Sequence, residues 1–191
     1  MIHSFRPSIF HKKMNDSVAR NLVAIRWIEP SRIVFKLSEP VMKQIDSGVE
    51  PDSEWDQRIQ VFDETMKHTS IALHFLEKIP WVETPLFEHY RMRLKSGETV
   101  RGQETIEDVA SLYETRMERL YRELASHGIS KLRIYRSNLQ ESPWVALDRN
   151  RQVLFGSQGN HRLSIAKVLG LKSFPVWVVG TYRKPKKRIS T

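Results

Sequence analysis

The chain has 191 residues, and none of them is cysteine. Disulfide bonds, thiol catalysis and cysteine-ligated zinc or iron–sulfur sites are therefore excluded. No apolar run approaches the roughly 20 residues that a membrane-spanning helix needs. Residues 1–20 read as an N-terminal arm, in which basic residues and a proline interrupt the apolar positions; this pattern does not fit a secretory signal peptide. We expect a soluble, cytoplasmic protein.

Sequence patterns for metal and serine chemistry are also missing. The seven histidines include no H-E-x-x-H or H-x-H spacing, so the sequence predicts no metal site. Ser164 has no G-x-S-x-G turn around it, which argues against a serine hydrolase. Glu54 and Asp56, in S-E-W-D, precede a helical pattern, where carboxylates cap and solvate more often than they catalyse.

Positive charge is in excess, and much of it lies at one end of the chain. There are 31 Lys and Arg against 22 Asp and Glu, for a net charge of +9. Five basic residues lie in R-K-P-K-K-R at 183–188, which leaves +4 for the rest. The tail of residues 181–191 is a candidate contact for phosphates or an acidic membrane surface. The simpler interpretation is a solvated, poorly ordered terminus.

The N-terminal third predicts two strands and then irregular structure. The apolar runs Val23–Ile28 and Ile33–Leu37 predict strands on either side of Pro30, which cannot lie inside a continuous central strand or helix. Residues 38–57 are rich in Pro, Ser, Gly and Asp and predict an irregular segment. A mixed segment further along the chain contains a predicted turn at Ser96-Gly97.

An insertion spanning residues 58–128 is expected to hold two long helices. Apolar residues at steps of three and four predict helices over Phe62–Lys78 and Ile106–His127. Thr105, with an acidic residue three positions later, predicts a capped start for the second helix, and Gly128 predicts its C-cap. The predicted buried stripes are Phe62, Met66, Thr69, Leu73 and Leu76 in the first helix and Ile106, Val109, Tyr113, Met117, Leu120 and Leu124 in the second.

The last third alternates strands with a glycine-rich loop and a helix. Trp144–Leu147 and Val153–Phe155 flank turn residues and predict a hairpin. Leu163–Leu169 has helical spacing, and Phe174–Val179 predicts a further strand. A helix between the last two strands indicates a crossover in a mixed sheet. The sequence therefore predicts one α/β (α+β) domain, residues 21–180, with a small mixed sheet.

The segment G-S-Q-G-N-H-R, between a predicted strand and a predicted helix, carries the clearest chemistry. Two glycines allow a sharp turn, and Asn160 is placed to cap the helix. The free N–H groups of the first helical turn attract an anion, which His161 and Arg162 would hold as cationic donors. We expect His161 to titrate near neutral pH. The candidate phosphate-binding residues are Gly156, Ser157, Gly159, Asn160, His161 and Arg162.

A structural alternative stands beside this hypothesis. In that interpretation the two glycines only turn the chain, Asn160 caps the helix, and His161 and Arg162 are surface groups. Trp55 and Trp81 are expected to anchor packing between helices and sheet rather than to stack on a nucleic-acid base.

The box G-N-H-R is followed by L-S-I-A-K-V-L-G-L and then by F-P-V-W-V-V. This order resembles the ParB/sulfiredoxin-like superfamily, whose pattern is a strand, a G-x-[HR]-R box, a helix, a glycine and a strand often opened by Ile-Pro-Val. The resemblance covers about residues 144–180. The N-terminal segments E-P-S-R-I and S-E-W-D are similar to those of ParB-like proteins with no settled activity. The resemblance implies a small mixed sheet with a two-helix insertion.

The superfamily uses the box to bind nucleotide phosphates. In sulfiredoxins a G-C-H-R box binds ATP, and its cysteine does the chemistry; Asn160 stands at that position here, which excludes sulfiredoxin activity. ParB partition proteins bind CTP with a related box, but this sequence lacks their E-N-x-x-R box, so chromosome partition is not expected. Free-serine kinases use a glutamate base, and Glu29 is the early acidic residue placed like it. The resemblance thus implies ATP or CTP with Mg²⁺ as ligand.

The sequence therefore predicts a protein that binds a nucleotide or another phosphate-bearing small molecule at residues 156–162. Phosphotransfer or nucleotide hydrolysis is the associated reaction class, with Glu29 and His161 as candidate catalytic residues and no assigned metal ligand. Two alternatives stay open. One is a nucleic-acid-associated protein whose basic tail and Arg162 meet phosphates, and the other is a non-catalytic interaction module.

Overall fold

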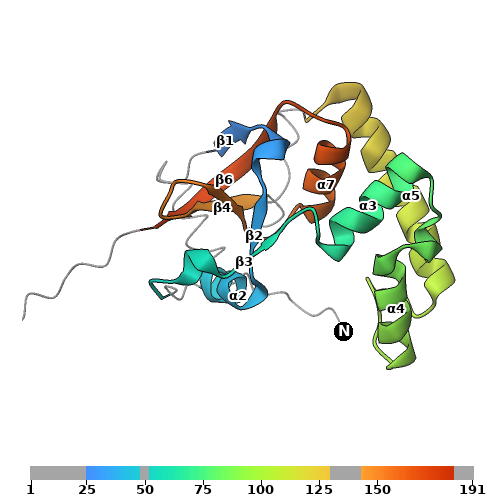
Figure 1. The fold of residues 1–191 in the computed structure, drawn as a ribbon. Helices are drawn as coiled ribbons and strands as arrows, with labels where there is room; N and C mark the ends of the chain where they lie inside the picture. Colours follow the sequence, from blue (N-terminus) through green and yellow to red (C-terminus); the bar gives the residue numbers. More distant parts are fainter. Residues whose placement is uncertain (1–24, 48–51, 130–142, 183–191) are drawn as a thin grey trace, which may run out of the picture.

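A computed structural model describes residues 25–47, 52–129 and 143–182 (Figure 1). Within them, six strands form one mixed sheet in the order β1-β6-β4-β5-β2-β3. Parallel pairing joins β2 to β5 and β4 to β6, and the other neighbours are antiparallel. The strands are β1 (Ile25–Ile28), β2 (Phe35–Leu37), β3 (Ile59–Val61), β4 (Trp144–Leu147), β5 (Val153–Phe155) and β6 (Phe174–Thr181). The predicted α+β class with a mixed sheet is confirmed.

Helices cover both faces of this sheet. Side chains alternate along β4, so Val145 faces the helix α7 while its neighbours Trp144 and Ala146 face α2. Figure 1 shows α3, α4, α5 and α7 gathered on one side of the sheet, with α2 apart from them. The α-helices are α2 (Glu39–Ser47), α3 (Met66–Glu77), α4 (Pro85–Lys95), α5 (Ile106–His127) and α7 (Asn160–Val168).

Helix α7 lies between the sheet and the other helices. Leu163 and Ala166 pack into the core cluster on the sheet, whereas Ile165 packs into the cluster built by α3, α4 and α5. All three side chains have no exposed surface. The helix that follows the glycine-rich loop therefore joins two hydrophobic cores, which fixes the position of its N-terminal end.

The prediction that residues 38–57 are irregular is wrong for the first half of this segment, which contains α2. Pro40 lies in the first turn of this helix, where a proline is tolerated since its missing N–H has no intrahelical partner. The predicted strand Ile33–Leu37 is also too long, because Ile33 closes a 3₁₀ turn at Pro30–Arg32 and is fully buried there. β1 begins at Ile25 in the part of the chain that the structure describes.

The first predicted long helix is displaced. Phe62 is buried beyond the end of β3, and α3 begins only at Met66, after Thr65 as N-cap. Its predicted stripe is wrong: Met66 is 42% exposed and Leu76 is 61% exposed. The buried face consists of Ser70, Ile71 and Phe75. Phe62 lies before α3 and Met66 begins it, so a helical repeat counted from Phe62 predicts the wrong buried face for α3.

The second predicted long helix is confirmed as α5. Val109, Tyr113, Met117 and Leu124 are buried, and Leu120 packs against their cluster. The Thr105 hydroxyl accepts from the Asp108 N–H, and Gly128 closes the helix with a φ of 58°. The insertion holds three helices rather than two, because α4 was not predicted. The turn predicted at Ser96-Gly97 is present at the end of α4, where Gly97 has a φ of 82°.

The last third follows the prediction closely. β4 and β5 form the expected antiparallel hairpin, and α7 then crosses to β6, which lies beside β4 and parallel to it. Thr181 ends β6, and the Tyr182 N–H donates to the Leu147 carbonyl, so the first two residues of the predicted tail belong to the folded part. The rest of the tail and the arm lie outside the described residues.

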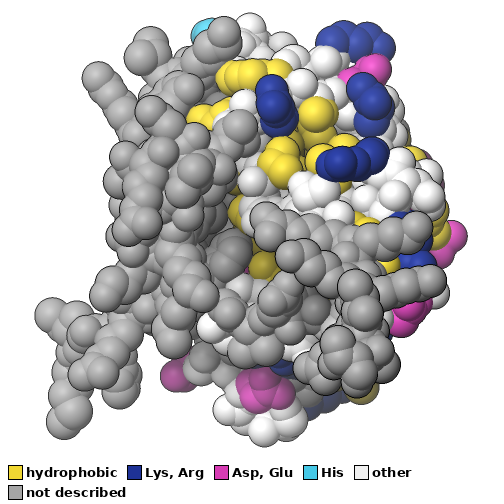
Figure 2. Space-filling view, turned by 90° about the vertical axis from the view of Figure 1, so that its left-hand side faces the viewer, with side chains coloured by type: hydrophobic (Ala, Val, Ile, Leu, Met, Phe, Trp, Pro, Cys, Tyr) yellow, Lys and Arg dark blue, Asp and Glu magenta, His cyan; other side chains and the backbone are white. Residues whose placement is uncertain are grey.

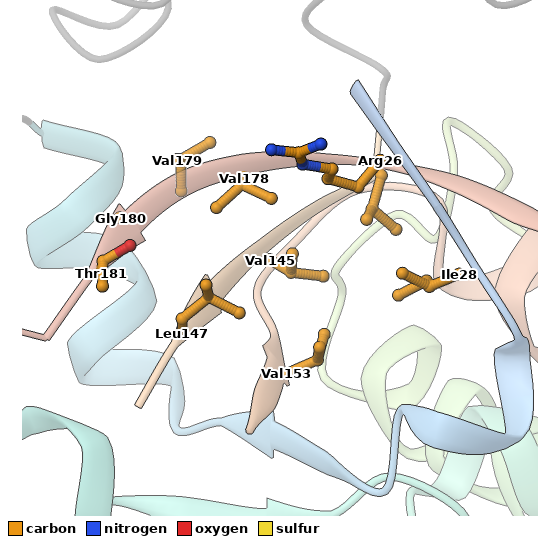
Figure 3. A pocket seen from close by; sticks show the side chains of 10 residues that line it. Arg26, Ile28, Val145, Leu147, Val153, Val178, Val179, Gly180 and Thr181 are labelled. Carbon is orange, nitrogen blue, oxygen red and sulfur yellow. The ribbon is translucent and has the colours of Figure 1, made fainter. Parts of the chain in front are cut away.

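The face of the sheet that packs against α7 also carries a hollow. A cavity of about 480 Å³ is lined by strand side chains such as Ile28, Val145, Leu147 and Val178, with Arg26 at its rim (Figure 3). Figure 2 shows hydrophobic side chains and separate Lys and Arg side chains interspersed on the described part of the face turned to the viewer. No described helix is both long and apolar enough to cross a membrane.

Candidate functional site

A cavity of about 610 Å³ lies where the N-terminal ends of α3 and α7 meet, and we call it the α3–α7 cavity. The start of α3 contributes its N-cap Thr65 and its first two residues, Met66 and Lys67, and α7 contributes its first residue, Asn160. The two helices pack side by side in Figure 1. Their partial positive N-terminal charges therefore act on the same space.

Basic side chains dominate the wall of this cavity. Lys36, Lys67, Arg93 and Arg101 line it, and among the described lining residues only Glu64 carries a carboxylate. The remaining wall includes Leu86, Tyr90 and Val100 on the side of α4 and the loop after it.

These cations are not equally compensated. Arg93 is paired with Glu98, whose carboxylate lies 2.7 Å from the Arg93 Nη2. Burial lowers the pKa of Lys36, and the nearby charge of Lys67 lowers it further, while Glu39 partly offsets both. The charge of Lys67 beside Lys36 is a local excess of positive potential, which a bound anion would relieve.

The N-terminus of α7 has no side-chain cap. Gly159 is the N-cap residue with a φ of 65°, so the cap position has no side chain that could accept from the first N–H groups. A Cβ on Gly159 would lie 2.6 Å from Pro143 Cγ, so both the backbone and the space favour glycine. The predicted cap by Asn160 is wrong: Asn160 is the first helical residue, and its side chain lines the cavity.

Gly156 and Ser157 hold the loop against the sheet rather than lining the cavity. A Cβ on Gly156 would lie 2.1 Å from the Trp144 ring. The Trp144 indole N–H donates to the Ser157 hydroxyl at 2.9 Å, and that hydroxyl lies 3.4 Å from Asp46 of α2. These two residues therefore position the start of α7.

His161 points toward the helical insertion. Its Nε2 lies 3.2 Å from the Tyr113 hydroxyl and 3.3 Å from Arg101 Nη2, and the Tyr113 hydroxyl lies 2.7 Å from that of Tyr90. An arginine can only donate, so Nε2 accepts. Burial raises the pKa of Tyr113, which keeps its hydroxyl protonated and able to donate.

The expectation that His161 titrates near neutral pH is wrong. Burial, followed by the charges of Arg101 and Lys67, lowers the pKa of His161 to about 3. The imidazole is therefore neutral at physiological pH and acts as an acceptor, with its proton on Nδ1. It cannot supply the positive charge that the sequence suggested.

Arg101 lies on a tight turn between α4 and α5. The N–H and carbonyl groups of Val100 and Gln103 exchange two hydrogen bonds of 2.9 Å. Arg101 and Gly102 between them have φ values of 54° and 79°, a combination typical of a type I′ turn. The guanidinium lies 5.3 Å from the centre of the Tyr113 ring.

The other candidate residues lie elsewhere. Arg162 is half-buried on α7, takes part in an interaction of its own and is not among the residues that line the cavity. Glu29 lines a separate cavity of about 400 Å³ and lies 3.4 Å from the Lys172 ammonium group. Asp56 is bound by Arg149 through two side-chain nitrogens, each at 2.8 Å. Within the described residues, no three His, Asp or Glu side chains gather as a metal-binding set.

Sequence reasoning missed most of the cavity. Lys36, Lys67 and Arg101 come from three separate segments, and no motif joins them. One signal was available: Thr65 precedes α3 and its hydroxyl accepts from the His68 N–H, so T-M-K-H could have indicated a helix start with a lysine in the first turn.

No protein-family model, curated protein or solved structure matches this chain. The resemblance to the ParB/sulfiredoxin-like superfamily therefore stays a prediction from the sequence, and a function has to be argued from the α3–α7 cavity itself.

Proposed function

We propose that this protein binds a nucleotide or another phosphate-bearing small molecule in the α3–α7 cavity. The observation that carries the proposal is the charge of the wall. Four basic side chains line it, of which Arg93 is paired with Glu98, and Glu64 carries the one carboxylate among the described lining residues. A ligand with several negative charges would offset this imbalance and occupy a volume of about 610 Å³.

The phosphate end of the ligand would lie at the helix N-termini. There the first turn of α7, whose N-cap is a glycine, and the side chains of Asn160 and Lys67 offer donors to phosphate oxygens. Lys36 supports the same end through its charge. As in the sequence hypothesis, main-chain N–H groups of G-N-H-R would bind the phosphate. The positive charge beside the phosphate would come from Lys36 and Lys67 rather than from His161.

The remaining wall suits the less polar part of such a ligand. Met66, Leu86, Tyr90 and Val100 offer apolar and aromatic surface for a base or a sugar ring. Glu64 is the carboxylate placed to act on a bound phosphate ester, so phosphate release is the activity to measure alongside binding.

Thermal unfolding against a ligand panel tests the proposal. The panel contains ATP, CTP, a sugar nucleotide, inorganic pyrophosphate and inorganic phosphate, each with and without Mg²⁺. A ligand at 100 times its dissociation constant adds about 2.7 kcal/mol to the free energy of unfolding, which is easily detected. Lys67→Gln should remove a charge-assisted contact of about 1.5–3 kcal/mol.

A matched control is Lys95→Gln, because Lys95 is exposed on α4 and is not among the residues that line the cavity. It should leave ligand affinity unchanged. The proposal fails if no member of the panel stabilises the protein, or if Lys67→Gln and Lys95→Gln have the same effect. Binding to a DNA or RNA oligonucleotide instead, unaffected by Lys67→Gln, would favour the nucleic-acid alternative.

A further inference from the structure

The wall of the α3–α7 cavity combines the sheet domain with the helical insertion. Asn160 and Lys36 belong to α7 and the sheet, whereas Tyr90 and Arg101 belong to α4 and the loop after it. Two polar contacts cross directly between the two parts at this point, those of Arg101 Nη2 and of the Tyr113 hydroxyl with His161 Nε2.

Arg101 is held in an unusual backbone conformation for its residue type. A φ of 54° is sparsely populated by side chains with a Cβ, and positions such as this are usually Gly, Asn or Asp in type I′ turns. Such strained positions cluster at ligand-binding sites, where the fold holds a side chain in place for use. Here the turn places the guanidinium at the cavity wall and close to the Tyr113 ring.

His161 supplies the acceptor that orients this guanidinium. Its Nε2 has one lone pair, which Arg101 Nη2 and the Tyr113 hydroxyl share as donors, and that hydroxyl is itself in contact with the Tyr90 hydroxyl. The guanidinium also interacts with the Tyr90 and Tyr113 hydroxyls. Because arginine has five N–H groups, these contacts and the one with Nε2 leave donors that a ligand in the cavity could engage. His161 is not among the residues that line the cavity and acts through Arg101.

We propose that Arg101 is a ligand-contacting residue which the helical insertion adds to the α3–α7 cavity, and that His161 is the positioning residue that holds it there. The proposal rests on the proposed function, since it assigns roles within the same anion site. It differs from the sequence hypothesis in the role of the box histidine, which accepts from an arginine instead of donating to the ligand.

Titration calorimetry of three variants with inorganic pyrophosphate and with ATP tests these roles. Arg101→Gln should weaken binding by about 10- to 150-fold, the loss expected when one charge-assisted contact is removed. His161→Leu should weaken it by about three- to tenfold, because Arg101 then loses its orientation but keeps its charge. His161→Gln should restore most of the affinity, since the glutamine side-chain oxygen reaches close to the Nε2 position and accepts there.

A double-mutant cycle separates positioning from folding. If His161 acts through Arg101, His161→Leu should add no further loss of affinity in the Arg101→Gln background. Arg119→Gln, an exposed position on α5, is the control with the same charge change and should bind like the unmodified protein. Thermal unfolding of each variant without ligand shows whether a loss of affinity comes from misfolding.

The outcomes distinguish this inference from the proposed function. Binding that Lys67→Gln weakens and Arg101→Gln leaves unchanged overturns the role of Arg101 and retains the site. Losses from His161→Leu and Arg101→Gln that simply multiply, or a His161→Gln variant as weak as His161→Leu, overturn the positioning role. If the unmodified protein binds neither pyrophosphate nor ATP, both proposals are wrong for these ligands.

Discussion

An ideal Cβ on Gly156 would lie 2.1–2.2 Å from three carbons of the Trp144 ring, which is itself fully buried. A methyl group there can be admitted only if the ring or the loop moves. We expect Gly156→Ala to lower the free energy of unfolding by about 1–3 kcal/mol, the range for overpacking a core. Gly170→Ala is the control, since its Cβ would meet nothing within 4 Å and only its φ of 62° opposes it. Urea unfolding should show the larger loss for Gly156→Ala; equal losses would contradict the packing argument.

His161 gives a second prediction at the level of one residue. Its pKa is about 3 in the folded protein, against an ordinary value of 6.5. As the pH falls from 6.5 toward 3, the unfolded chain takes up a proton that the folded protein does not, so this group lowers the stability across that window. In His161→Gln, the free energy of unfolding should fall less between pH 6.5 and pH 3. NMR of the histidine rings should show His161 still neutral at pH 5, and titration near 6.5 would refute the buried, neutral assignment.

Only part of the site could be predicted residue by residue from the sequence. The local features of the box are visible in the chain, because the turn at Gly159 and the start of α7 depend on neighbouring residues. The direction of His161 is not, since it depends on Tyr113, 48 positions away, which a separate helix brings alongside. Lys36 and Lys67 reach the cavity through the pairing of β2 with β3 and the packing of α3 on α7. No local pattern records such contacts.

Between elements, the pair Asp56–Arg149 links the 3₁₀ turn Trp55–Gln57 to the β4–β5 hairpin. The Asp56 carboxylate accepts from the Arg149 N–H and from two guanidinium nitrogens, and the Asp56 side chain is 2% exposed. These hydrogen bonds lower the pKa of Asp56, so the pair stabilises the fold above the ordinary carboxyl pKa of 3.8 and loses this effect as the pH falls through the lower folded value.

Asp56→Asn should therefore lower the melting temperature by several degrees at pH 7, with a smaller difference from the unmodified protein at the acid end of the range. Glu54→Gln is the matched control, because Glu54 lies 3.4 Å from Arg149 and is 60% exposed. Its substitution should change the melting temperature little. A larger effect from Glu54→Gln than from Asp56→Asn would show that Asp56 is not the anchoring partner.

The accuracy of the element predictions follows the length of each element. α5 extends over 22 residues, so its stripe repeats often enough to fix both the helix and its buried face. β3 has three residues, too few to show alternation, and its continuity with Phe62 displaced the predicted start of α3. α2 and α4 each have a proline in the first turn. In a sequence a proline usually indicates the end of a helix, although in the first turn it favours helix formation.

Considered as one molecule, the protein packs two hydrophobic layers against α7, one formed by the helices and one on the adjacent face of the sheet, while the opposite face of the sheet packs against α2. The helical layer is built on Trp81, Phe87 and Tyr113, and Ile165 of α7 is buried among them. On its other side α7 adds Leu163 and Ala166 to the core on the sheet. Neither layer keeps its apolar surface covered without this helix, so the two should unfold in one cooperative transition.

Ile165→Ala tests this coupling because it removes apolar atoms only from the helical side of α7. We expect a loss of about 2–5 kcal/mol, the range for truncating a fully buried aliphatic side chain. Leu76→Ala, at a position 61% exposed, should cost far less. Trp81 is the tryptophan of the helical layer, whereas Trp144 lies in the sheet. The difference in fluorescence between the protein and its Trp81→Phe variant therefore reports on the helical layer.

In the Ile165→Ala variant, the helical-layer fluorescence and far-ultraviolet circular dichroism should still change at one denaturant concentration. Two separate midpoints would show that the helical layer folds without the sheet, and the α3–α7 cavity would then lie between two independently stable units.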